Sequence, residues 1–276
     1  MKKISISTLS IIAGASAFIS LVLRVICLFL FYDDIGYYKS GAALPIIANI
    51  LFGISIAFFL FAAIFLTEKK QSVEPTGKLS QYAALLPMGA LIFHVIRIFV
   101  TPYNDTNVNK YLMAISAIAA AAFFFLIFFA KKEYKTVTFY VGLGALIYVF
   151  LCWMFTYFDF FIPINSTDKI FFYISCAGAI LFIFNEMCAC YGFVRPRFYY
   201  FSLFAAVIAL SVSAVSAVIG FVGGAIKAYI TLEADIFFIA LLVYAVARLI
   251  DAQSSKPVAE EKQNEEAEEQ NADVSE

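Results

Sequence analysis

Eight apolar stretches, each of about 20 residues or more, constrain the fold of this 276-residue chain more than any other feature. A helix needs about 20 apolar residues to cross the roughly 30 Å of hydrocarbon in a bilayer. The chain is 63% hydrophobic and 14% charged, whereas an ordinary globular domain has about a quarter charged residues. The sequence therefore predicts an all-α, polytopic integral membrane helix bundle with short loops. Its eight transmembrane helices are expected at about 6–31, 43–66, 82–101, 111–130, 137–158, 170–192, 199–222 and 229–249.

The N-terminal run is longer than the apolar core of a cleavable signal peptide, which has about 7–15 residues. We therefore expect 6–31 to be retained as the first span. The basic residues outside the spans alternate in density from one connection to the next. By the positive-inside rule the connections rich in Lys and Arg lie in the cytoplasm. This pattern predicts a multi-pass protein of a bacterial plasma membrane with both termini cytoplasmic. The 13 basic residues assigned to the inner side are Lys2, Lys3, Lys69, Lys70, Lys78, Lys131, Lys132, Lys135, Arg195, Arg197, Arg248, Lys256 and Lys262, against Lys39, Lys110, Lys169 and Lys227 on the outer side.

The chain changes character after Ile250, so residues 1–250 are interpreted as the bundle and 251–276 as a separate segment. Residues 251–276 are rich in Glu and Asp and have no apolar face to bury. Such a composition is typical of disorder. We expect an acidic cytoplasmic tail, which either only solubilises the protein or binds a basic cytoplasmic partner protein.

Short sequence matches between spans suggest four tandem helical hairpins. "GALIFHVIRIFVT" (89–101) and "GALIYVFLCWMFT" (144–156) share GALI, a following aromatic residue and a final Thr at the same spacing. "KYLMAIS" (110–116) and "KIFFYIS" (169–175) match in the even-numbered spans. Parallel repeats occur in transporters and also in purely structural bundles. The matches therefore predict a repeat without selecting a function.

Ionisable residues inside spans are costly and usually face the bundle or a water-filled cavity. Arg24, His94, Arg97, Glu233 and Asp235 all fall in the predicted outer half of the membrane. His94 and Arg97 are three residues apart and so share a helix face. We expect these five residues to form an outward-facing polar pocket. The alternatives are a structural ion pair of Arg97 with Glu233 or Asp235, or separate snorkelling of the arginines to the membrane surface.

A second candidate site lies in "FNEMCACYG" (184–192), in the predicted inner half of the sixth span. Asn185 and Glu186 are polar there, and no basic residue is expected inside any span at that depth. A lone Glu186 would suit proton coupling or cation binding, or would be a protonated structural residue. Glu186, Cys188 and Cys190, at spacings of i, i+2 and i+4, do not all converge on one helix face, so we expect no metal site.

Small residues and prolines mark the other irregular positions. Ser216, Gly220 and Gly224 are spaced by four, which favours close helix packing, with a bent helix along a pathway as the alternative. Pro45 and Pro87 are expected to kink the second and third spans.

The sequence contains no phosphate-binding loop of the GxxxxGK[ST] type and no HExxH zinc motif. We therefore predict no catalytic residue, cofactor or metal, and no nucleic-acid partner because the net charge is only −1. Five cysteines lie within apolar runs and are interpreted as packing residues. The best functional hypothesis is a small-solute permease or ion-coupled carrier. The alternative is a non-catalytic membrane subunit or sensory module with a cytoplasmic partner, and a lipid-acting intramembrane enzyme ranks last.

Overall fold

The computed structural model describes residues 6–33, 37–65, 77–100, 107–129, 135–159, 163, 166–226 and 232–254. These parts of the chain are helical, apart from turns and an isolated antiparallel bridge between Tyr32 and Tyr38. The long helices are α1 (Ile6–Phe31), α2 (Ala43–Phe65), α4 (Leu85–Val100), α5 (Asn107–Phe129), α6 (Lys135–Phe158), α7 (Thr167–Tyr191), α8 (Pro196–Leu210) and α10 (Leu232–Ser254). The short ones are α3 (Lys78–Ala83), the π-helix η2 (Ser211–Val215) and α9 (Ser216–Val222).

The all-helical prediction is confirmed, and the number of spans is confirmed only in part. Among the described residues, seven helical stretches are long and apolar enough to cross a membrane. These are Ile6–Phe31, Ala43–Ala62, Lys78–Val100, Val108–Phe129, Lys135–Phe158, Thr167–Tyr191 and Pro196–Val222. The predicted eighth span is helical as α10 but is not one of the seven. α10 carries Glu233, Asp235, Arg248 and Asp251, and it continues to Ser254, past the expected boundary at Ile250. The rest of the predicted tail, 255–276, lies outside the described residues.

The two prolines have different effects because they occupy different positions in their helices. Pro87 lacks the N–H that would bond the carbonyl of Ala83, and its ring crowds that carbonyl. The third span is accordingly broken between α3 and α4, which confirms the expected interruption. Pro45 lies in the first turn of α2, where no intrahelical bond is lost. The prediction of a kink at Pro45 was therefore wrong.

The seventh span changes its helical pitch in the middle. α8 runs into η2, in which the backbone forms a π turn, and then continues as α9. Gly220 supports the close-packing interpretation, because a Cβ there would lie 2.9 Å from Cδ1 of Ile226 and 3.3 Å from Cδ1 of Leu28. Gly224 lies beyond the helix in a turn with a φ of +75°, a conformation that glycine adopts without strain.

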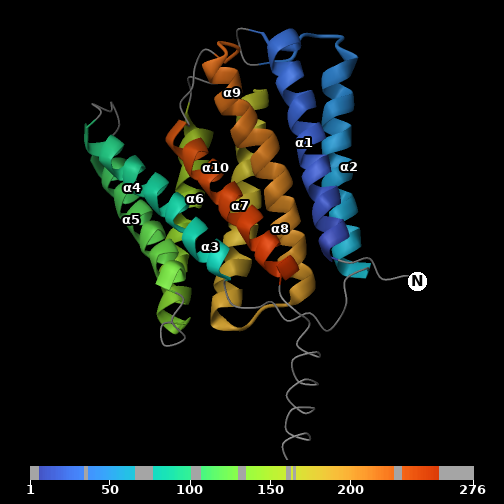
Figure 1. The fold of residues 1–276 in the computed structure, drawn as a ribbon. Coiled ribbons are helices and arrows are strands. Elements are labelled where there is room, and N and C mark those ends of the chain that lie inside the picture. The colour runs from blue at the N-terminus through green and yellow to red at the C-terminus, as the bar shows by residue number, and fades with distance from the viewer. Residues whose placement is uncertain are drawn as a thin grey trace, which may run out of the picture.

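α10 occupies a central place in the bundle. It packs against α3 and α4 on one side and against α8 and η2 on the other. α4, α5, α6, α7 and α8 pack in chain order, and α1 and α2 pack together and against α8 (Figure 1). The two helices of each predicted hairpin are neighbours, but α5 with α6 and α7 with α8 are neighbours too. The contacts therefore do not single out four repeated hairpins.

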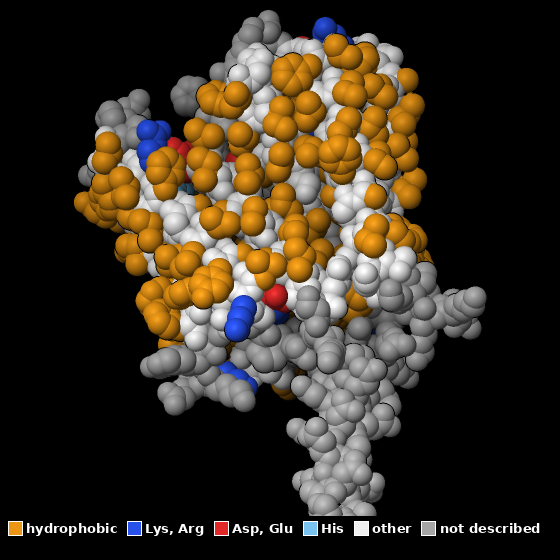
Figure 2. Space-filling model, viewed as in Figure 1, with side chains coloured by type: hydrophobic (Ala, Val, Ile, Leu, Met, Phe, Trp, Pro, Cys, Tyr) orange, Lys and Arg blue, Asp and Glu red, His pale blue; other side chains and the backbone are white. Residues whose placement is uncertain are grey.

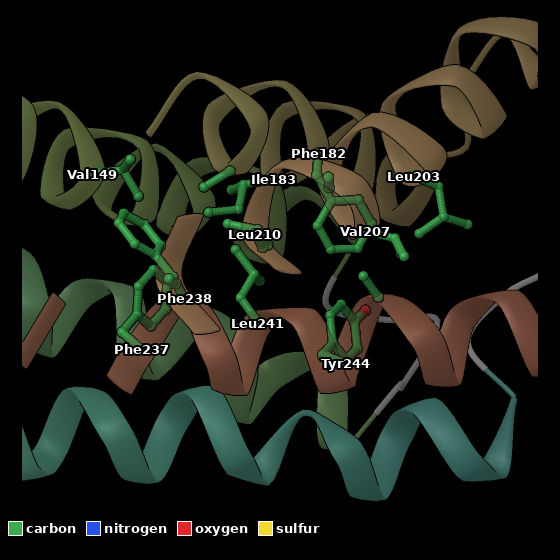
Figure 3. Packing of buried hydrophobic residues seen from close by; sticks show 14 of the residues in the cluster. Val149, Phe182, Ile183, Leu203, Val207, Leu210, Phe237, Phe238, Leu241 and Tyr244 are labelled. Carbon is green, nitrogen blue, oxygen red and sulfur yellow. The ribbon is translucent and has the colours of Figure 1, made fainter. Parts of the chain in front are cut away.

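Aromatic and aliphatic side chains pack together in the middle of the bundle around α10 (Figure 3). The ring of Tyr244 lies 5.8 Å from that of Phe124 on α5 and 5.8 Å from that of Phe182 on α7. Phe237 lies 5.2 Å from Tyr148 on α6. All five side chains are fully buried. Burial of such large rings is a major contribution to packing within the bundle.

The outward faces of the helices are apolar rather than polar. Large side chains such as Ile11, Phe18, Ile54, Ile115 and Phe150 are more than half exposed. Apolar side chains cover the middle of the face in Figure 2, while charged side chains show near its two ends. Apolar surface of this extent is typical of a protein surrounded by lipid. The protein therefore has the architecture of a multi-pass membrane protein.

The start of α1 and the end of α10 lie at the same end of the bundle (Figure 1). We call this the terminal end, and the other the opposite end. At the terminal end Oδ2 of Asp251, on α10, accepts hydrogen bonds from the backbone N–H of Ser80 (2.8 Å) and from its hydroxyl (2.5 Å). Gly77 allows this contact, because a Cβ there would lie 2.4 Å from Cγ of Asp251. The last turn of α10 is thus attached to the first turn of α3.

Candidate functional site

Glu186 forms the centre of a buried polar cluster at the terminal end. Its Oε1 accepts hydrogen bonds from Nε of Arg248 (2.5 Å) and from the hydroxyls of Tyr199 and Tyr244 (3.0 Å each). Its Oε2 lies 3.3 Å from both Nη2 of Arg248 and the hydroxyl of Tyr199. The cluster joins α7, α8 and α10. It satisfies the carboxylate with one cation and two neutral donors, as a buried charge requires.

The expectation that Glu186 has no basic neighbour was wrong. Sequence reasoning placed Arg248 at the end of the last span, among the residues of the cytoplasmic side. In the structure α10 continues for six residues beyond Arg248. This residue is 5% exposed, and its side chain is directed at Glu186, which is 1% exposed. Leu249 and Ile250 after Arg248 continue the apolar pattern, and that was the signal for a longer helix. A proton or cation would therefore have to displace Arg248 in order to bind Glu186.

Asn185 does not belong to the Glu186 cluster. Its side-chain amide donates to the carbonyl of Leu181, one turn earlier in α7 (2.9 Å). A side chain that bonds its own helix needs no partner from another element. The structure therefore gives the two adjacent polar residues different surroundings.

His94, Arg97 and Glu233 come together at the opposite end, as the sequence predicts. Nε of Arg97 lies 3.2 Å from Oε1 of Glu233, which joins α4 to α10. The Arg97 side chain is 44% exposed and that of Glu233 is 10% exposed. Nδ1 of His94 lies 2.7 Å from the hydroxyl of Tyr148 on α6, and His94 is within electrostatic reach of Glu233. The structure thus contains the ion pair that sequence reasoning gave as one alternative, with the histidine beside it.

Asp235 is in the same turn of α10 as Glu233 but has different neighbours. It is 2% exposed and lies within electrostatic reach of Cys152 on α6 and Cys176 on α7. It belongs to the bundle interior, whereas Glu233 lies toward α4. The two carboxylates therefore do not form one acidic face.

Arg24 is not part of the cluster around His94, so the expectation of a five-residue pocket was wrong for this residue. Its Nη2 lies 3.3 Å from Oδ1 of Asp168 on α7, and Nη1 donates to the hydroxyl of Tyr38. The guanidinium also lies 3.9 Å from the ring centroid of Phe171. Arg24 is only 3% exposed, so it does not snorkel to the membrane surface. It fastens α1 to α7 at the opposite end.

Sequence reasoning did not select Asp168, although its position carried a signal. Ser166 caps α7 by accepting from the backbone N–H of Lys169 (3.3 Å), and Asp168 is in the first turn. Ser followed by an acidic residue is typical of a helix start, where negative charge is favourable. The hydroxyl of Tyr32 also donates to Asp168, so this carboxylate organises the opposite end of α1 as well.

The cysteines show no sign of a cross-link. All five are free, and Cys27, Cys152 and Cys176 are buried, which agrees with their interpretation as packing residues. Within the described ranges, no three His, Cys, Asp or Glu side chains are grouped so that they could hold a metal ion.

Comparison with protein-family models, curated proteins and solved structures finds no match for this chain. The site therefore has to be interpreted from its own geometry. That geometry places one ion pair of α10 at each end of the bundle, Arg97–Glu233 at the opposite end and Glu186–Arg248 at the terminal end, with the aromatic rings between them.

Proposed function

We propose that this protein is a small-solute permease or ion-coupled carrier in which α10 is the gating helix. The observation that carries the proposal is the pair of ionic contacts at the two ends of α10, separated by a closely packed aromatic centre. A carrier has to close each end of its pathway in turn, and ion pairs between helices are contacts that can be broken and remade. The described conformation corresponds to a state with both ends closed.

The carboxylates of the two pairs explain how an ion would be coupled to movement. Breaking a buried ion pair by leaving one charge without a partner costs about 3–5 kcal/mol. A proton or cation that neutralises Glu186 or Glu233 removes part of this cost at one end only. Aromatic side chains such as Phe237 and Tyr244 would then change rotamer to admit a solute. The coupled ion thus determines which end opens.

The proposal also includes a topology for the chain in the membrane. We infer that α10 is an eighth crossing, that both termini are cytoplasmic and that the terminal end faces the cytoplasm of a bacterium. Lys78, Lys135, Arg195 and Arg197 support this orientation, because they begin helices at the terminal end and a cytoplasmic surface favours basic residues. We also retain the proposal of four hairpin repeats, which rests on the matched GALI segments at 89–92 and 144–147.

Two native cysteines provide a test of alternating closure. Cys190 lies within electrostatic reach of Glu186 and Arg248, and Cys152 is buried near Asp235 at the other end of the bundle. Two proteins would be made, each retaining one of these cysteines with the other four replaced by alanine. Reaction with a membrane-impermeant maleimide would be followed in inside-out vesicles for Cys190 and in whole cells for Cys152.

We expect Glu186→Gln to raise the labelling rate of Cys190 several-fold and to leave or lower that of Cys152. Glu233→Gln should have the reverse effect. The matched control is Asp168→Asn, which removes a carboxylate outside both contacts of α10 and should leave both rates in place. Equal increases at both cysteines would indicate general loosening and would contradict the proposal, as would no change at either one.

A second candidate function is a membrane subunit or sensory module that binds a cytoplasmic partner through the acidic tail. The observation that favours it is the attachment of Asp251, the first residue of the predicted acidic segment 251–276, to Ser80. This contact links the base of the tail to α3 and, through α10, to the opposite end of the bundle. Truncation should follow Ser254, because removal of Asp251 would itself disturb α3. Loss of function and of copurifying protein on this truncation, with Glu186→Gln silent, would favour the second candidate over the carrier.

A further inference from the structure

His94 belongs to neither ion pair of α10. It is the only histidine in the chain, and it lies on α4 one turn before Arg97. It is 8% exposed. Its Nδ1 lies within hydrogen-bonding distance of the hydroxyl of Tyr148, and Glu233 is within electrostatic reach. Histidine is the side chain whose charge changes most readily between pH 5 and 8. A buried histidine beside an ion pair that joins two helices is therefore placed to alter that pair.

The ionisable groups around His94 come from three helices. Arg97 is on its own helix, Tyr148 is on α6 and Glu233 is on α10. Glu233 is the one carboxylate among them, and it already neutralises Arg97. A positive charge on His94 would therefore share Glu233 with Arg97.

The other helices that pack on α4 bring no described ionisable group to His94. On α5, the ring of Tyr111 lies 6.4 Å from that of Phe99, and both of these side chains are exposed. Lys110 precedes Tyr111 in the same turn. On α3, Lys78 and Tyr82 are exposed near the terminal end. The balance of charge around His94 is thus set by Arg97 and Glu233.

We infer that the coupled ion is a proton and that His94 takes it up from the side of the membrane that the opposite end faces. This inference rests on the carrier function proposed above. The proton comes from water, binds the unprotonated nitrogen of the imidazole and gives an imidazolium with two N–H donors and no acceptor. Nδ1 then has to donate to the oxygen of Tyr148, whatever the direction of this hydrogen bond before protonation. Glu233 turns toward the new cation, and its contact with the half-exposed Arg97 weakens.

The direction of this effect follows from the exposure of the two cations. Arg97 is 44% exposed, so water replaces the lost contact with Glu233 at little cost. The imidazolium at His94 is buried and has no such replacement, so it attracts the carboxylate more strongly. Proton uptake therefore loosens the connection between α4 and α10 at the opposite end, while Glu186–Arg248 remains intact at the terminal end.

The single histidine permits a direct test by NMR. The full chain would be prepared with ¹⁵N-labelled histidine, without purification-tag histidines, in lipid nanodiscs. The ring nitrogens of His94 then give the only imidazole signals, and these distinguish neutral from protonated rings. We expect the ring to change from neutral at pH 8 to imidazolium at pH 5. Glu233→Gln, which removes the carboxylate that stabilises the cation, should require about tenfold more acid for the same change.

Asp168→Asn is the matched control, since this carboxylate lies at the same end of the bundle but is paired with Arg24. It should leave the His94 titration where it is in the wild type. A ring that stays neutral down to pH 5 in the wild type would overturn the inference, even if the variants fail to fold. An unchanged midpoint in folded Glu233→Gln would overturn it too.

Labelling of Cys152 in whole cells separates this inference from the carrier itself. If proton uptake releases the opposite end, the labelling rate rises several-fold between pH 8 and 5, and this rise is absent in His94→Gln. Titration of His94 without any change in labelling would support the proton site and contradict the gate. Reciprocal labelling of Cys152 and Cys190 with a His94 that does not titrate would leave the carrier standing and would contradict the proton site.

Discussion

At the scale of single residues, the charges within the bundle are arranged in pairs with different exposure. Glu186 and Arg248 have side chains that are 2% and 6% exposed, whereas Arg97 is 44% exposed. A buried charged group has lost its hydration and depends on its partner for stabilisation. An exposed charged group that loses its partner is hydrated again. Substitutions at the two pairs should therefore differ in their effect on stability.

We predict that Arg248→Met lowers the free energy of unfolding by about 3–5 kcal/mol, because it leaves the Glu186 carboxylate buried beside two neutral tyrosines. The double substitution Glu186→Leu with Arg248→Met should recover most of this loss, since no charge then remains in the cluster. Glu233→Gln is the comparison and should cost about 1 kcal/mol or less, because the Arg97 side chain that it leaves behind is 44% exposed and returns to water. Reversible denaturation of the purified protein in mixed micelles measures all three. A double variant as unstable as Arg248→Met alone would contradict the ion-pair account.

Sequence reasoning anticipated one ionic contact, that of Arg97 with Glu233, and missed others. Glu186, His94, Arg97 and Glu233 were selected because polar groups inside spans are rare. The partner of Glu186 was missed, because a basic residue at the end of an apolar run resembles a loop residue. More generally, the core face and the lipid face of a membrane helix are both apolar, so the sequence says little about which way each side chain points.

At the scale of helices, contacts depend on small residues where backbones approach. Gly144 on α6 is an example, because a Cβ there would lie 2.4 Å from Cβ of Ala119 on α5. An alanine at position 144 would require the two helices to separate, since Ala119 has no flexible side chain that could move aside. By contrast, Gly14 on α1 has open space around its Cβ position.

We predict that Gly144→Ala destabilises the protein by about 1–3 kcal/mol through overpacking between α5 and α6. Gly14→Ala should be neutral or stabilising by up to about 1 kcal/mol, because alanine favours the helix. The shift in thermal unfolding temperature of the two variants, measured under the same conditions, gives the comparison. If both glycines respond alike, the close approach of α5 and α6 is not present.

At the scale of the whole molecule, the long apolar runs were sufficient to predict the class of fold. They gave seven of the helices as spans, and they located α10 as a helix. They did not predict the central position of α10, which carries four charged residues and still lies among the other helices. Its central position depends on contacts between helices far apart in the chain. Neither hydropathy nor charge in the loops reports such contacts.

The single tryptophan tests whether lipid surrounds the bundle. Trp153 is on α6, is 37% exposed and packs near Tyr173 and Phe150. We predict that lipids with brominated acyl chains quench its fluorescence strongly in reconstituted protein, because its exposed edge contacts acyl chains. Aqueous iodide should have little effect. Efficient quenching by iodide with no effect of brominated lipid would show that this face is in water.

The π turn between Ser211 and Val215 also has an evolutionary consequence. Such a turn contains one residue more than an ordinary helix needs for the same advance, and deletion of a single residue would return the segment to regular pitch. The extra residue is absorbed within the turn, so Ser216 and the residues after it would face the same way after such a deletion. A deletion in the regular helix of α8 or in the first residues of α9 is different, because each residue there accounts for about 100° of rotation. Gly220 would then no longer face Leu28 and Ile226, and bulkier side chains would collide there instead. Single-residue deletions should therefore be tolerated within Ser211–Val215 and selected against in the regular helix around it.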